Sequence, residues 1–381
     1  MTLIIFFAVL ALLIITHEFG HFLFAKLSKV KVEEFGLGFP PRIFGFQKGE
    51  TLYSVNLIPF GGFVKIFGEE GLPADLPAET SAQAGALAKE GEENKDKRSF
   101  GAQRFHVRAL ILAAGVLFNL FLAWPFLSAT YVVGVPMSVE QSDASGGILT
   151  EKGVMIIEIQ KDTPAETAGL KSADFLLHFS SGNDILKVSN VKEVQDFIAS
   201  HAGKEIKIDY SRDGKKFSVQ AVPSVKPENG KASLGIAMDE VGIVKFPFYK
   251  AVWQGLVSTI RLTGLTAKAL VAFFVDIFTK RTMLSQVAGP IGIAGLVGSA
   301  WQSGFVFILQ LVALLSINLA LINFIPFPAL DGGRLLFLAV EFIRRKPISQ
   351  KTANIANNIG FTILIFLMLA ITYQDISKII R

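Results

Sequence analysis

The sequence contains no cysteine, so disulfides and thiolate metal ligands are excluded, and any metal ion must be held by histidine or carboxylate side chains. Charge is also scarce, because only 18% of the 381 residues are Asp, Glu, Lys or Arg, while 51% are hydrophobic. The net charge of +5 is small and distributed, which gives no indication of a nucleic-acid partner. This composition predicts a polytopic α-helical protein whose main partner is the lipid bilayer.

Four apolar segments are long enough to cross a membrane as helices, namely residues 1–27, 109–133, 305–331 and 355–373. The first lacks a basic region before its apolar run and a clear small-residue cleavage site, so we expect a retained span and not a signal peptide. Lysines and arginines follow the first span, precede the second and follow the third. The positive-inside rule therefore places these three ends at the cytoplasmic face.

The segments between the spans differ in character. Residues 32–67 combine turn-forming Gly and Pro with strand-like alternation, which is typical of a β-loop that re-enters the membrane or of a plain cytoplasmic hairpin. Residues 68–104 are polar and read as a cytoplasmic linker. Residues 140–242 predict one small α/β domain outside the cytoplasm, and residues 246–281 predict an amphipathic helix at the membrane interface.

The first span contains the motif His17-Glu18-Phe19-Gly20-His21. Residues four apart share one helix face, so the two imidazoles can bind a single Zn²⁺, with Glu18 beside them as general base. A polar cluster at the membrane edge, satisfied by water, is the alternative. Charged groups inside a span cost roughly 2.5–3.5 kcal/mol each, which favours a functional use.

Asp331 lies at the end of the third span, which the charge bias puts on the same side of the membrane as the end of the first. We therefore expect its carboxylate to lie within reach of His17 and His21.

These motifs, together with Phe60-Gly61-Gly62-Phe63-Val64-Lys65 and Asn323-x-x-Pro326-x-Pro328-x-Leu330-Asp331-Gly332-Gly333, resemble the site-2 protease family of intramembrane zinc metalloproteases. The resemblance implies that His17, His21 and Asp331 are the zinc ligands and that Glu18 is the general base. It also implies that Asn318 and Asn323 hold an unwound substrate backbone, although hydrogen bonds between helices are an alternative role for both. Residues 140–242 resemble a PDZ domain.

The resemblance implies a bacterial inner-membrane protease that cuts transmembrane segments of single-span proteins, with its active site near the cytoplasmic side and its PDZ-like domain outside. An anti-sigma factor, already cut by an upstream site-1 protease, and remnant signal peptides are the implied substrates. Two other functions remain open from the residues alone. Intramembrane His, Glu and Asp also mark ion transporters, and a PDZ-bearing membrane scaffold can keep a structural metal site.

Overall fold

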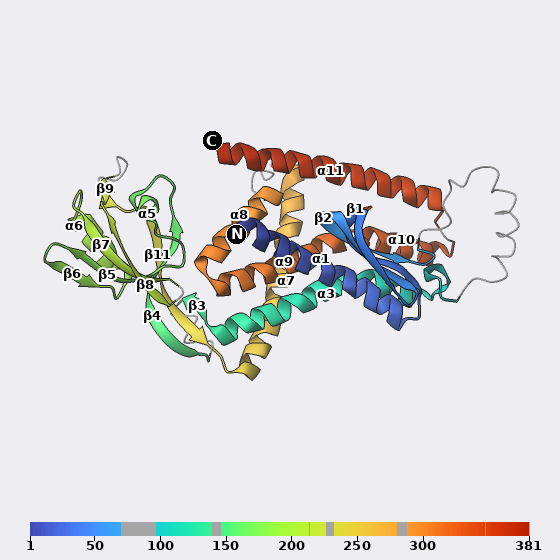
Figure 1. The fold of residues 1–381 in the computed structure, drawn as a ribbon, viewed down its shortest axis with the longest axis horizontal. Helices are drawn as coiled ribbons and strands as arrows, with labels where there is room; N and C mark the ends of the chain where they lie inside the picture. Colours follow the sequence, from blue (N-terminus) through green and yellow to red (C-terminus); the bar gives the residue numbers. More distant parts are fainter. Residues whose placement is uncertain are drawn as a thin grey trace, which may run out of the picture.

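The computed structural model describes residues 1–69, 97–138, 146–212, 214–225, 232–279, 288–346 and 348–380 (Figure 1). The linker expected over 68–104 therefore lies largely outside the described residues. The helices are α1 Thr2–Leu27, η1 Phe100–Ala102, α3 Phe105–Val133, α5 Pro164–Thr167, α6 Val191–Ser200, α7 Phe248–Thr279, α8 Pro290–Ser303, α9 Phe305–Phe324, α10 Asp331–Arg344 and α11 Gln350–Ile380. The strands are β1 Val32–Lys48, β2 Thr51–Ile66, β3 Val135–Ser138, β4 Ile148–Ile159, β5 Phe175–Ser181, β6 Asp184–Lys187, β7 Ile206–Arg212, β8 Lys215–Ala221, β9 Ser224–Val225, β10 Ala232–Ser233 and β11 Ile236–Lys245.

Helix α3 is the centre of the helical part, because it packs against α1, α7, α9 and α10. Small residues allow the close approach of α1 to α3. A β-carbon on Gly20 of α1 would stand 2.5 Å from the carbonyl oxygen of Ala114 on α3. Pro125 lies inside α3 without ending it. This tight crossing places the second half of α1, which carries the two histidines, directly on α3.

The third expected span, over 305–331, is shorter than the sequence indicated. Helix α9 ends at Phe324, and α10 begins at Asp331. The apolar composition continues to Leu330, but Pro326 and Pro328 cannot donate the backbone hydrogen bonds that would continue the helix. The chain instead turns through Ala329, whose φ of +73° is left-handed. The turn lets Asp331 face α1 from the start of a new helix.

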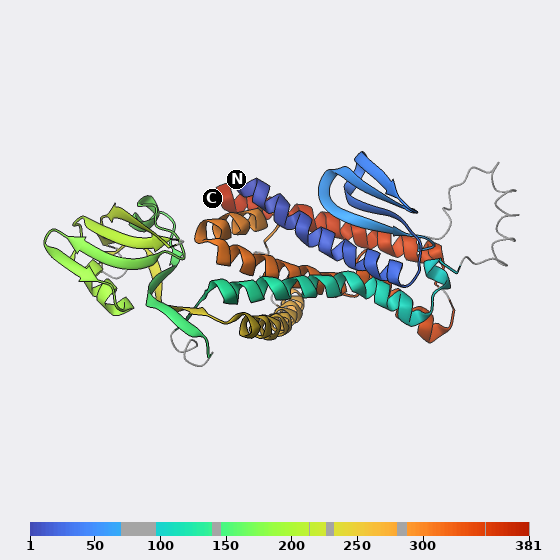
Figure 2. The same cartoon turned by 60° about the horizontal axis from the view of Figure 1, so that its bottom comes forward.

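Among the residues that the structure describes, five helices are long and apolar enough to cross a membrane: α1, α3, most of α7, α9 and α11. Helix α7 is the least apolar of them, with a mean hydropathy of 1.4 over its best window against 2.0 to 2.6 for the others. Figures 1 and 2 show that α7 runs across the bundle, whereas α1, α3, α9 and α11 follow its long axis. The four helices along the axis correspond to the four expected spans.

Strands β1 and β2 form a curled hairpin beside α1 (Figure 2). Residues 32–39 lie in the middle, since they pair on one side with residues 52–58 and on the other with residues 62–66. Residues 42–48 continue the sheet beyond 52–58. Residues 62–66 are therefore an edge strand of this small sheet, next to the helix that carries the histidines.

The domain between α3 and α7 is built on a sheet with the order β3-β11-β4-β5-β7-β8. Its core holds apolar side chains from β4, β5, β7 and α6, including Ile156, Phe179, Val194 and Ile208, all fully buried. Strand β3 follows α3 after a single residue, and β11 leads into α7. Because β3 and β11 pair with each other, the domain is joined to the bundle by a paired ribbon.

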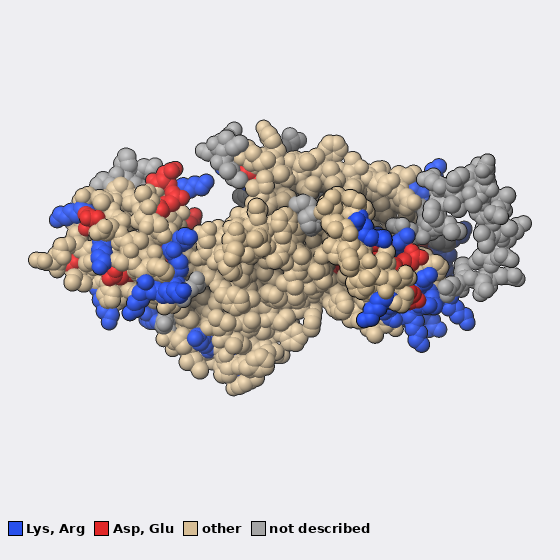
Figure 3. Space-filling view, viewed as in Figure 1, with Lys and Arg blue, Asp and Glu red and all other residues tan. Residues whose placement is uncertain are grey.

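Charged side chains gather at the two ends of the molecule (Figure 3). One group lies around the β1–β2 hairpin, and the other covers the domain between α3 and α7. The visible surface between them is almost free of charge, as expected for a belt of lipid-facing side chains.

Candidate active site

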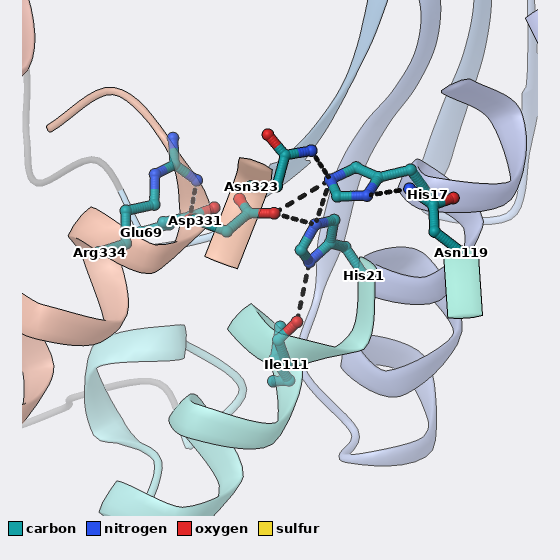
Figure 4. Close-up of polar contacts among 8 residues, drawn as sticks. All are labelled: His17, His21, Glu69, Ile111, Asn119, Asn323, Asp331 and Arg334. Carbon is teal, nitrogen blue, oxygen red and sulfur yellow. Dashed lines mark hydrogen bonds and ion pairs between the residues drawn. The ribbon is translucent and has the colours of Figure 1, made fainter. Parts of the chain in front are cut away.

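The two imidazoles of α1 lie on one face, where α3 covers them. His17 and His21 keep only 7% and 8% of their surface exposed, and their Nε2 atoms are 3.3 Å apart. The helix forms here because the run from Thr2 onward consists almost entirely of helix-compatible apolar residues, with no proline. The spacing of four residues thus produces the expected pair of nitrogen donors (Figure 4).

Asp331 reaches the same point from the first residue of α10. Its Oδ2 lies 3.0 Å from Nε2 of His17 and 3.2 Å from Nε2 of His21. The close start of α10 depends on Gly332, because a β-carbon there would stand 2.3 Å from the carbonyl oxygen of Phe324 at the end of α9. The structure therefore brings together the three side chains that the sequence predicted to meet.

The donor set fits a zinc ion. Ligands about 2.0–2.1 Å from tetrahedral zinc stand about 3.3 Å from one another, and the three separations here are 3.0, 3.2 and 3.3 Å. Oδ2 of Asp331 is buried, and within the described part of the chain no hydrogen bond satisfies it, despite the two imidazoles beside it. A shared cation accounts for this arrangement of one carboxylate and two imidazole nitrogens better than hydrogen bonding does.

Helix α3 supplies polar contacts to the far sides of both imidazoles. Nδ1 of His21 donates a hydrogen bond to the carbonyl oxygen of Ile111, at 2.8 Å. Nδ1 of His17 lies 3.1 Å from Nδ2 of Asn119, which is fully buried. Sequence reasoning assigned no role to either residue. A backbone carbonyl leaves no trace in the sequence, whereas Asn119 is visible there as a polar residue inside an apolar span.

A cavity of about 400 Å³ opens beside the three donors. It is lined by Glu18 from α1, Gly62 and Val64 from the edge strand, Asn323 from α9, and Leu330 and Arg334 from the α9–α10 turn and α10. Glu18 thus faces the same space as the donor atoms. Nη1 of Arg334 donates to Oε1 of Glu69 at 2.6 Å, which links α10 to the segment after the hairpin.

The two asparagines of α9 differ in position. Asn323 lines the cavity, and its Nδ2 lies 3.4 Å from Nε2 of His17. Asn318 is five residues earlier, about 140° away around the helix, and is not among the residues that line the cavity. The structure therefore brings Asn323, but not Asn318, to the cavity.

A catalytic-type donor set and an acidic side chain facing one cavity, inside a bundle of helices long enough to cross a membrane, define a membrane-embedded metallopeptidase.

Residues 5–367 match Peptidase family M50, and the chain therefore belongs to this family. Similar proteins include the Zinc metalloprotease RasP of Oceanobacillus iheyensis, 28% identical with 99% of each chain covered. The Regulator of sigma-W protease RasP of Bacillus subtilis is also 28% identical, with 99% of each chain covered. The crystal structure of the PDZ domain of the SdrC-like protein from Listeria monocytogenes is similar to 24% of this chain and to 92% of that domain, with 23% identity and a TM-score of 0.21.

The predicted membership of the site-2 protease family is thereby confirmed, as is the prediction that the chain is a zinc metalloendopeptidase. Within the family, its motifs also resemble those of the bacterial regulator-of-sigma-E protease. The chain is a bacterial membrane protein with several helices able to span the bilayer.

Proposed function

We propose that His17, His21 and Asp331 hold the catalytic zinc ion, that Glu18 is the general base, and that the enzyme hydrolyses peptide bonds within transmembrane segments. The observation that carries this proposal is the meeting of the three donors, from α1 and α10, at tetrahedral spacing beside a cavity that Glu18 also lines. Zinc, when bound there, supplies a Lewis acid that polarises the scissile carbonyl and the attacking water.

Glu18 accepts the proton of the attacking water and delivers it to the leaving amide nitrogen. It follows His17 directly on α1, and a β-carbon on Gly62 would lie 3.0 Å from its Cγ, so the edge strand passes next to the base. The protein around Glu18 keeps bulk water from competing for its carboxylate. Acid–base catalysis of this kind contributes roughly 10²–10⁴ in rate.

Substrate enters the cavity as an extended segment that pairs with the edge strand, residues 62–66. A transmembrane helix hides its carbonyls in i→i−4 hydrogen bonds, so it must unwind before any peptide bond can be cut. The edge strand offers free backbone groups to the unwound segment, in the manner of β-strand addition. Asn323 lines the cavity and carries an amide that both donates and accepts, so it holds the backbone near the cleaved bond.

The charge distribution supports an orientation in the bilayer. The end of the molecule with the β1–β2 hairpin carries Lys26, Lys29 and Lys31 and faces the cytoplasm, and the hairpin dips into the bilayer beside α1. The opposite end, with the PDZ-like domain, then lies outside the cytoplasmic membrane. Helix α7 lies along the outer interface, because it runs across the four spanning helices and is the least apolar of the five candidates.

The substrate class follows from this site and from the relatives. One similar protein is named a regulator of sigma-W protease, which implies an anti-sigma factor as one class of substrate. A site-2 cleavage follows an earlier cut by a site-1 protease, which removes most of the ectodomain. Remnant signal peptides are equally short apolar segments and form a second class.

The test uses the purified full-length protein and a short transmembrane peptide as substrate. Glu18→Gln should keep zinc and lose roughly 10²–10⁴ in the rate of cleavage, because glutamine preserves size but is no base. Asp331→Ala, His17→Ala and His21→Ala should each lose both zinc and activity. Glu158→Gln, the same change at an exposed residue of β4 in the domain between α3 and α7, is the matched control. Normal turnover of Glu18→Gln, or unchanged zinc content of Asp331→Ala, contradicts the assignment.

A further inference from the structure

The carboxamide of Asn119 is buried against His17, and one of its two polar atoms is unpaired. The residue is fully buried on α3, and its Nδ2 lies 3.1 Å from Nδ1 of His17. In the part of the chain that the structure describes, its Oδ1 is buried without a hydrogen-bond partner. A buried polar atom left unpaired is costly, so the orientation of this amide requires a physical explanation.

The hydrogen bond of His21 indicates which ring nitrogen of His17 must carry the proton. Its Nδ1 carries the proton, because that atom donates to the carbonyl oxygen of Ile111 at 2.8 Å. Its Nε2 therefore presents a lone pair, and this atom is the one that faces Asp331. Nε2 of His17 faces the same carboxylate, at 3.0 Å. If both imidazoles bind one cation through Nε2, both must carry their proton on Nδ1.

An amide NH₂ group facing Nδ1 of His17 contradicts this requirement. An NH₂ donor there demands a lone pair on Nδ1, which moves the proton to Nε2 and turns the edge that faces Asp331 into a donor. Rotating the carboxamide of Asn119 by half a turn exchanges two atoms of nearly equal size. Oδ1 then accepts a hydrogen bond from Nδ1–H of His17, and the NH₂ group takes the former place of the oxygen, so the tautomer of His17 that zinc requires decides between the two orientations.

We propose that Asn119 is a positioning residue whose side-chain oxygen accepts a hydrogen bond from Nδ1–H of His17 and so holds Nε2 ready for zinc. This inference rests on the proposed role of His17 as a ligand. Helix α3 then fixes both imidazoles in the same tautomer, one through a backbone carbonyl and one through an amide. Ser316 of α9 donates from Oγ to the backbone carbonyl of Asn119 at 2.7 Å, which fixes this part of α3.

The experiment measures zinc affinity of the purified full-length protein, by competition with a chromophoric chelator. Asn119→Leu and Asn119→Ala remove the acceptor, one with similar volume and one with less. Asn119→Asp keeps an oxygen that accepts from Nδ1–H. Thr130→Val is the control, because Thr130 is a buried polar residue of the same helix whose hydroxyl donates to the carbonyl oxygen of Leu127 and not to an imidazole. His17→Ala tests the ligand itself. Helical circular dichroism and gel filtration of the metal-free proteins identify variants that fail to fold.

We expect Asn119→Leu and Asn119→Ala to lose about 10- to 100-fold in zinc affinity, and Asn119→Asp and Thr130→Val to stay within severalfold of wild type. A residue that only packs would give the opposite order, since leucine fits an apolar helix contact better than a buried carboxylate does. Zinc affinity of folded Asn119→Leu or Asn119→Ala equal to that of wild type, or Asn119→Asp as weak as both, overturns the inference. If His17→Ala keeps wild-type affinity, the ligand set of the proposed function is wrong as well. If His17→Ala loses zinc while the Asn119 variants do not, only the inference fails.

Discussion

Gly115 of α3 stands so close to His21 of α1 that a β-carbon on the glycine would lie 2.3 Å from Nε2 of the imidazole. The same β-carbon would lie 2.7 Å from Cε1 of His17. The backbone of α3 is thus one wall of the donor cluster, and a side chain of any size at position 115 would occupy the space of the imidazoles.

Gly115→Ala should therefore displace both donor nitrogens. Overpacking a tight contact costs about 1–3 kcal/mol, so we expect zinc affinity to fall roughly 5- to 150-fold, with activity falling in parallel. Gly295→Ala is the control, because a β-carbon on this glycine of α8 meets nothing within 4 Å. Zinc titration of both variants measures the effect. Equal affinity of Gly115→Ala and wild type would mean that the wall can shift at little cost.

Periodicity and charge were enough to predict the core of this site. His17 and His21 share a face because the helical repeat requires it. Asp331 could be assigned to the same region because lysines and arginines mark the adjacent ends of two spans. Neither inference needs coordinates, and the three side chains do lie together.

Features that depend on tertiary contacts were not predictable. The end of α9 at Phe324 was missed because the apolar composition continues past the helix to Leu330. The carbonyl of Ile111 has no side-chain signature, and the strand order of the hairpin follows from pairing that alternation alone does not define. The crosswise direction of α7 agrees with the expected interfacial helix, but its length and composition equally fit a span.

Backbone pairing of substrate with residues 62–66 predicts a sharp alternation in substrate analogues. In an antiparallel or parallel ladder, successive residues direct their N–H groups to opposite sides. In a series of substrate peptides that each carry one N-methyl group, cleavage should therefore be slower when the methylated residue faces the edge strand. It should be almost unchanged when the methyl group is on the residue before or after. Loss of one hydrogen bond of about 0.5–1.5 kcal/mol corresponds to roughly a 2- to 10-fold change.

The matched control is the same methylation scan outside the segment that enters the cavity, where no alternation is expected. Cleavage rates of a peptide series, measured at concentrations below KM, give the answer. Equal sensitivity at successive positions would exclude strand addition as the way in which substrate is held.

Glu50, at the turn of the β1–β2 hairpin, ties the hairpin to the end of α1 and to the segment before α3. Arg98 and Lys26 donate to its Oε1 at 2.6 and 2.7 Å. These hydrogen bonds, that of Arg98 first, lower the pKa of Glu50 from 4.5 to about 2. Because the folded pKa is the lower one, the contribution is complete above pH of about 4.5 and is lost as pH falls toward 2.

Glu50→Gln should therefore loosen the turn at neutral pH and make it insensitive to acid in that window. Amide hydrogen exchange of the hairpin measures both effects, and we expect only a modest increase in exchange because the pair is solvent-exposed. The difference from wild type should shrink in 1 M salt, where the Debye length is about 3 Å. A difference that persists in high salt would assign the effect to packing and not to charge.

The domain between α3 and α7 should act as a filter on substrates and take no part in the chemistry. Asn119, which touches the site, lies about 21 Å along α3 from the helix end at Val133, where the domain begins. A folded ectodomain is then excluded by its size until another protease removes it. Residues 139–240 can be deleted without separating the strands that flank them, because Ser138 of β3 pairs directly with Val241 of β11. An Asn-Gly turn in place of residues 139–240 would close these strands as a two-residue hairpin and keep the ribbon below the domain.

The shortened protein should bind zinc and cut a short transmembrane peptide at the wild-type rate, because the donors and the cavity belong to the helices and the β1–β2 hairpin, which the deletion keeps. It should also cut a substrate that still carries its folded ectodomain, which we expect wild type to reject. Cleavage rates of both substrates measure the effect, and the deletion variant with Glu18→Gln controls for contaminating proteases. A folded deletion variant that holds zinc but cannot cut the short peptide would show instead that the domain supports the active site directly.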